Sequence, residues 1–220
     1  EHFGSANSWD VIRSQVPLTF QPTLELAHGD YAAWDDLFMF LKGRNLADYS
    51  LYQEAVKKVD VTGFIDYLLV NLYSANQDWP WNNWTAARER VPDGRFRFFE
   101  WDSDISFLKS PGVTTRSIDK LEGESNHIPV LYRALKASPE FKLLFADRIQ
   151  KHFFNNGALS KSKLTETFQV LRADVEDMIA QVYGGEPFDT YILDTWIPQR
   201  QEILIQHLSS AGLWSTIKAP

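Results

Sequence analysis

Asp78, Asn83 and Asp102 are the residues whose types and order suggest chemistry. Asn83 follows Asp78 by five residues, and Asp102 stands at the end of the second of two short runs with strand-like composition. A carboxylate can orient an attacking hydroxyl and accept its proton. Carboxylate and amide oxygens are also ligands that Mg²⁺ accepts. An Asp–Asn pair at this spacing is common by chance, so the prediction rests on the ordered combination with the intervening hairpin.

Phosphoryl transfer needs these groups close together. A carboxylate must face the acceptor, oxygen ligands must hold Mg²⁺ against a triphosphate, and a rigid element must fix their positions. Protein kinases meet this need with an Asp, an Asn five residues later, and a metal-binding Asp after the following hairpin. The order of Asp78, Asn83 and Asp102 therefore predicts ATP- and Mg²⁺-dependent phosphoryl transfer.

Each of the three residues also has a structural interpretation. Asp78 would cap a turn or a helix, and Asn83 would bond loop backbone groups, as Asn often does. Asp102 would pair with Arg88 or Arg90 across the hairpin. We interpret the nearby carboxylate of Asp104 as a supporting or structural group.

The elements before and around these residues are mostly helical by pattern. Helices are expected over residues 30–41, capped by Asp30 and stopped by Gly43, and over residues 49–58. A strongly apolar helix follows Asp60 to about residue 71. Pro80 prevents its continuation, because proline restricts the residue before it.

A β-hairpin is expected after this break. Its runs are residues 84–91 and 95–101, and Gly94 in Pro-Asp-Gly would supply the positive φ of the turn. Residues 109–126 are expected to form a polar loop. Further helices are predicted at residues 128–136, from Ser138-Pro139 to before Gly157, from Ser160 to Gly184-Gly185, and from Pro198 to Gly212.

The predicted fold is mainly α with one β-hairpin. Residues 1–28 have no clear period and are expected to form a loose opening segment, followed by a single domain over residues 29–215. The chain starts mid-stream at Glu1, so we interpret it as a fragment of a longer parent chain.

The central part of the chain resembles the spore-coat protein H (CotH) kinase family. The segments that carry the resemblance are Phe64-Ile65-Asp66-Tyr67-Leu68-Leu69-Val70-Asn71-Leu72, Asn76-x-Asp78-Trp79-x-x-Asn82-Asn83 and Phe98-Phe99-Glu100-Trp101-Asp102. Residues 145–153 are a less specific match to the C-terminal helices of bacterial members. The resemblance extends over residues 30–210.

This resemblance implies an atypical protein kinase, from a family known for phosphorylating spore-coat proteins. The domain would be a protein-kinase-like C-terminal lobe with ATP and Mg²⁺ as cofactors. Asp78 would be catalytic, and Asn83 and Asp102 would bind the metal and the nucleotide phosphates. The acceptor would be a protein Ser or Thr. The family setting implies an extracellular or cell-surface location.

The chain departs from ordinary protein kinases in two ways. Asn76-Gln77 replaces the His-Arg before the catalytic Asp, and Pro80 replaces the catalytic-loop Lys. The nucleotide-gripping N-lobe is also missing, because the chain ahead of Asp78 is short, reads as helical and holds no Gly-rich loop. We therefore expect this lobe elsewhere in the parent chain, and we expect the fragment alone to be inactive.

Composition excludes several other classes. The net charge is −7 without a basic cluster, which argues against nucleic acid and anionic membranes as partners and suits a basic protein substrate. No apolar run is long enough to span a membrane. Cysteine is absent, so disulfides, thiolate metal sites and cysteine nucleophiles are excluded.

Two rival functions remain open. Trp79, Trp81 and Trp84 surround the predicted loop, so a non-enzymatic surface module could bind a glycan or a protein there. Asp102-x-Asp104 after an apolar strand is also how nucleotide-sugar transferases hold Mn²⁺. That scaffold needs several βα units before the motif, where this sequence predicts helices.

Overall fold

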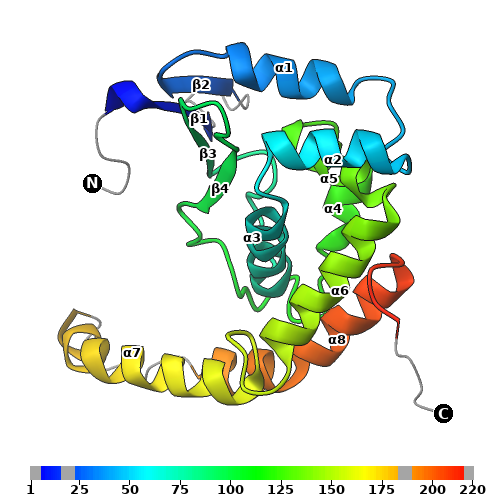
Figure 1. Ribbon diagram of the computed structural model, residues 1–220. Coiled ribbons are helices and arrows are strands. Elements are labelled where there is room, and N and C mark those ends of the chain that lie inside the picture. The colour runs from blue at the N-terminus through cyan, green and yellow to red at the C-terminus, as the bar shows by residue number, and fades with distance from the viewer. Residues whose placement is uncertain (1–5, 16–22, 183–189, 216–220) are drawn as a thin grey trace.

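The structure is a computed structural model, and it describes residues 6–15, 23–182 and 190–215 (Figure 1). The strands are β1 (Trp9–Gln15), β2 (Thr23–His28), β3 (Trp84–Glu89) and β4 (Arg97–Glu100). The helices are α1 (Ala32–Leu41), α2 (Tyr49–Lys58), α3 (Val61–Ser74), α4 (Ile118–Gly123), α5 (His127–Lys136), α6 (Pro139–Phe153), α7 (Lys161–Val182) and α8 (Ile197–Ser210). A 3₁₀ turn, η1 (Ala6–Ser8), precedes β1, and a π-helical turn, η2 (Ile192–Trp196), precedes α8.

The four strands form one antiparallel sheet in the order β2-β1-β3-β4. The predicted hairpin is confirmed as β3 and β4, with Trp84 opposite Glu100. The expectation of only one hairpin is wrong, because β1 and β2 add two strands. These strands lie in the opening segment that was predicted to be loose. The division of the chain at residue 29 stays a prediction.

The turn of the β3–β4 hairpin requires glycine for a different reason than expected. Gly94 is not among the residues with positive φ. A Cβ at this position would instead lie 2.0 Å from the backbone oxygen of Glu89. Close approach of the two chain segments, rather than a left-handed conformation, therefore selects glycine there.

Most predicted helices are confirmed within a few residues. Asp48 and Asp60 cap α2 and α3 through their side chains, and Ser138 caps α6 with Pro139 in the first turn. The expected polar loop at residues 109–126 is wrong in part, because it contains the short helix α4. The predicted C-terminal end of α7 at Gly184-Gly185 lies outside the described residues.

Helix α3 runs through the middle of the molecule and anchors the core (Figure 1). Ten of its fourteen residues are buried, and it contacts β4, α6 and α8. Its apolar residues, at three- and four-residue spacings, face these neighbours on several sides. Within the described residues, no helix combines the length and apolar character that a membrane span needs.

Candidate functional site

The loop of residues 76–83 leaves the C-terminal end of α3 directly. Ala75 ends the helix in the left-handed conformation, with φ of 52°. The buried Trp79 then fixes the loop against α3, because its indole N–H donates to the Tyr67 hydroxyl at 2.7 Å. Burial raises the pKa of Tyr67 well above its usual value, so this phenol stays neutral.

Strand β1 supports the other end of this loop. The backbone N–H of Asn83 donates to the backbone oxygen of Ser14 at 3.1 Å. The Ser14 hydroxyl in turn donates to the backbone oxygen of Trp81 at 2.6 Å. The strand that sequence patterns did not reveal therefore helps to position the predicted site.

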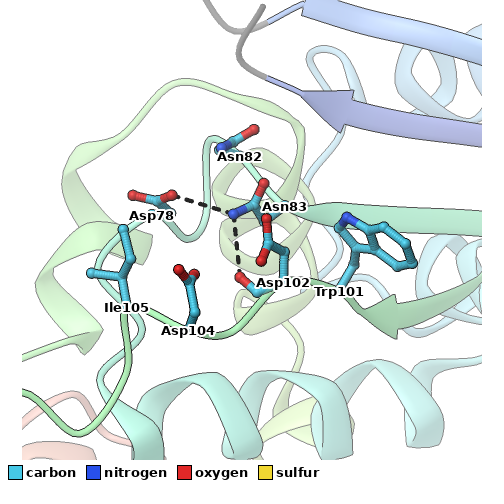
Figure 2. Close-up of a pocket in the computed structure, with 7 residues that line it drawn as sticks. All are labelled: Asp78, Asn82, Asn83, Trp101, Asp102, Asp104 and Ile105. Atoms are coloured by element: carbon cyan, nitrogen blue, oxygen red, sulfur yellow. Dashed lines mark hydrogen bonds between the residues drawn. The ribbon is translucent and has the colours of Figure 1, made fainter. Parts of the chain in front are cut away.

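The structure brings the three predicted residues together. The side-chain Nδ2 of Asn83 donates to Oδ2 of Asp78 at 3.2 Å and to the backbone oxygen of Asp102 at 3.2 Å (Figure 2). Asn83 thus connects the loop after α3 to the segment that follows β4. Asp78 and Asp102 lie on opposite sides of this amide group.

These residues line a cleft of about 350 Å³. The lining residues are Asp78, Asn82, Asn83, Trp101, Asp102, Asp104 and Ile105. Three are carboxylates and none is cationic, and Figure 2 shows the Asp104 carboxylate between Asp78 and Asp102. Grouping carboxylates in this way concentrates negative charge in the cleft, and a divalent ion bound there would offset it.

Asn83 and Asp102 both adopt left-handed backbone conformations, with φ of 57° and 53°. Asn and Asp tolerate this region better than most residues, although it remains less favourable than extended or helical backbone. Side chains held in uncommon conformations often lie at functional sites, where the surrounding structure fixes them. Six non-glycine residues of the described ranges have positive φ, and Asn83 and Asp102 are the two that line the cleft.

The structural alternative for Asp102 is wrong. Arg88 Nη1 lies 3.3 Å from Oδ2 of the buried Asp10, and Arg90 Nε lies 2.9 Å from Oδ1 of the same residue. Arg90 also pairs with Asp30. Both arginines therefore pair with other carboxylates, at the end of the hairpin opposite to Asp102.

Sequence reasoning assigned no role to Glu100, which connects the two segments of the site. Its Oε2 accepts a hydrogen bond from Asn71 of α3. Its Oε1 accepts from Asn76 at 3.3 Å and from Ser103 at 2.5 Å. Desolvation raises the pKa of Glu100, and these three bonds oppose that rise. An acidic residue between Phe99 and Trp101 was the available sequence signal.

The donor set fits a magnesium ion that also binds substrate phosphate. Within the described ranges, no group of three or more His, Asp or Glu side chains is arranged to hold a metal by itself. Magnesium commonly binds one or two protein carboxylates and completes its shell with phosphate oxygens and water. Asp102 and Asn83, with Asp104 nearby, match that chemistry.

The tryptophans of the loop and the hairpin differ in exposure. Trp79 and Trp84 are buried and belong to the hydrophobic core. Trp81 is partly exposed, and Trp101 is 59% exposed on the cleft wall. Of these four tryptophans, only Trp81 and Trp101 expose surface, and Trp101 is the one that lines the cleft.

Comparison with known proteins identifies the family. The family model described as CotH kinase protein matches residues 13–209. This match spans well over half of the chain, so the chain belongs to the CotH kinase family, and the suspected resemblance is confirmed. Membership indicates a kinase-like function at the level of the family. Searches of curated proteins and of solved structures gave no match.

Proposed function

We propose that the chain forms the catalytic lobe of a CotH-type kinase that transfers the terminal phosphoryl group of ATP to a protein Ser or Thr. One observation carries this proposal. Asp78 and Asn83 of the loop after α3 and Asp102, which follows the hairpin 19 residues after Asn83, line one acidic cleft and are connected through the Asn83 side chain.

Asp78 is the proposed catalytic residue. Its carboxylate would orient the acceptor hydroxyl and take its proton. The hydroxyl oxygen forms the new bond to phosphorus while the bond between the terminal phosphorus and its bridging oxygen breaks. The bond's electron pair leaves with ADP. Asn83 holds one Asp78 oxygen at 3.2 Å, which fixes the orientation of the carboxylate.

Asn83 and Asp102 are the proposed ligands for Mg²⁺ and, through it, for the nucleotide phosphates. When bound, the ion would neutralise charge on the transferring group. Asp102 presents its carboxylate two residues after the end of β4, and Asn83 presents its carboxamide from the position just before β3. Asp104 adds a third negative charge on the same cleft.

The remaining parts of the proposal concern partners. A net charge of −7 suits a basic substrate segment. The nucleotide-gripping lobe would belong to the parent chain, so activity assays should use the parent protein. A bacterial spore-coat or cell-surface setting rests on family analogy.

A second candidate is a binding module for glycan or protein. The exposed Trp101 on the cleft wall favours it, because aromatic faces contact sugars and peptides well. The third possibility, a nucleotide-sugar transferase, needs βα units before its metal motif. In the described residues, α1, α2 and α3 occupy that part of the chain after the β1–β2 pair.

Calorimetric titration of the parent protein with Mg-ATP tests the proposal. Asp102→Ala should abolish Mg-ATP binding. Asp78→Asn should keep binding and lower kcat by about 10²–10⁴-fold. Binding that needs a nucleotide-sugar would support the transferase, and indifference to both ligands would support the binding module.

A further inference from the structure

Lys120 of α4 is bonded to the backbone of the predicted catalytic loop. Its Nζ donates to the backbone oxygens of Asn76 at 2.9 Å, Gln77 at 2.8 Å and Trp79 at 3.0 Å. These carbonyl groups lie on both sides of Asp78 in the sequence. A lysine ammonium has three N–H donors, and three acceptors are present.

An aromatic ring also contacts this ammonium. Nζ lies 4.8 Å from the centroid of the Trp81 ring, a favourable cation–π distance. Burial lowers the pKa of Lys120 to about 8, and the negative charges of Asp78 and Glu124 oppose that shift. The group therefore remains mainly protonated at neutral pH.

The loop has no cation of its own. Residues 76–83 contain no Lys, Arg or His. Three backbone carbonyl oxygens that converge on one point repel each other, and their alignment needs a donor between them. Lys120, more than forty residues later in the sequence, provides this donor.

We propose that Lys120 is the positioning residue for Asp78: it fixes the loop backbone on both sides of this carboxylate. The inference rests on the proposed function of Asp78. Lys120 does not line the cleft. Since its three N–H groups are directed at loop carbonyls, it acts through the loop and not by contacting phosphate.

Lys120→Met is the variant that tests this inference, and Arg133→Met is its matched control. Arg133 Nη1 also donates to three backbone oxygens, those of Leu121 at 2.8 Å, Glu122 at 3.4 Å and Glu124 at 2.7 Å. These oxygens belong to the C-terminal half of α4 and the residue after it. The control therefore weakens the same helix without removing a bond to residues 76–83.

Amide hydrogen exchange measures the loop without requiring activity. The relevant amides are those of Gln77, Asn82 and Asn83, which donate to the backbone oxygens of Ile105, Asp78 and Ser14. In Lys120→Met, exchange at these amides should accelerate by about tenfold or more, since local opening becomes easier. In Arg133→Met it should stay at the wild-type rate. Unchanged exchange in Lys120→Met, or equal acceleration in both variants, overturns the inference.

Kinetics of the parent protein give the second readout. Lys120→Met should lower kcat by about 10–100-fold while Mg-ATP affinity changes by less than about twofold, because the loss lies in positioning. Wild-type kcat should also decrease above about pH 8, where Lys120 deprotonates, and this decrease should be absent in Lys120→Met. Wild-type kcat in Lys120→Met overturns the inference. If Asp102→Ala still binds Mg-ATP, the proposed function is wrong. The hydrogen-exchange result on the loop does not depend on that outcome.

Discussion

Replacing Asn83 by Ala and by Gly separates its proposed metal-binding role from its structural role. Asn83 is only 8% exposed, and its side chain donates two hydrogen bonds of 3.2 Å. Removing these bonds costs about 1 kcal/mol each. Alanine at a φ of 57° adds about 1–2 kcal/mol of backbone strain, whereas glycine adopts this conformation freely.

Both variants should therefore be less stable than the wild type, but by different amounts. The loss in free energy of unfolding should be about 2–3 kcal/mol for Asn83→Gly and about 1 kcal/mol more for Asn83→Ala. Urea unfolding in the absence of nucleotide measures this difference. Mg-ATP affinity should instead decrease equally in the two variants, because both lack the carboxamide oxygen. Each should lose at least about tenfold in affinity, by the same factor.

The comparison of the two variants decides between the roles. If both bind Mg-ATP as tightly as the wild type, Asn83 is a structural loop residue and is not a metal ligand. If the affinity loss follows the stability loss, and is larger for Ala than for Gly, backbone strain explains the effect. Equal affinity loss at unequal stability is the result expected for a ligand.

Two further predictions concern stability. Burial against aromatic rings lowers the pKa of His127, and the negative charge of Asp35 opposes this shift. As the pH falls, His127 therefore becomes protonated in the unfolded chain before it does so in the folded chain. The free energy of unfolding should therefore decrease below about pH 6.5. In urea unfolding at pH 5–7, His127→Phe should reduce this dependence of stability on pH. The same pH dependence in the variant and the wild type would show that other groups cause it. Gly94→Ala should lose about 1–3 kcal/mol, because its Cβ would lie 2.0 Å from the Glu89 oxygen. Gly123→Ala, with nothing within 4 Å, should be nearly neutral, and similar thermal unfolding of the two variants would contradict the close-approach explanation.

Local signals made the helices and the hairpin predictable. Asp60 and Ser138 are caps that act within three residues, so the sequence alone locates the starts of α3 and α6. Strand β1 carries no such signal. It pairs with β3, whose residues lie far along the chain, and with β2 across residues 16–22. Its conformation depends on these partners, which is why its sequence showed no period.

The same distinction applies to the site. Asp78, Asn83 and Asp102 were predictable because their order along the chain reflects a loop, a hairpin and a strand end. Their meeting in one cleft agrees with that prediction, whereas their roles stay predictions. The roles of Glu100 and Lys120 were not predictable, because each forms hydrogen bonds with loop residues that are distant in the sequence. Glu100 accepts from Asn76, 24 positions away, and Lys120 donates to Asn76, 44 positions away. The position of Glu100 between Phe99 and Trp101 makes it unusual, but no neighbour of Glu100 or Lys120 in the sequence indicates which distant residues it contacts.

The supports of the loop share a further property that bears on how the site should respond to substitution. Ser14 and Lys120 bind backbone atoms of residues 76–83, and Tyr67 binds the side chain of the buried Trp79. None of these contacts uses the Asp78 side chain. The loop conformation should therefore persist when that carboxylate is changed to an amide, so Asp78→Asn changes the chemistry of the site while its architecture remains. Substitution of Ser14, Tyr67 or Lys120 should have the opposite effect. Every side chain that lines the cleft is then still present, but the loop no longer holds these side chains in position.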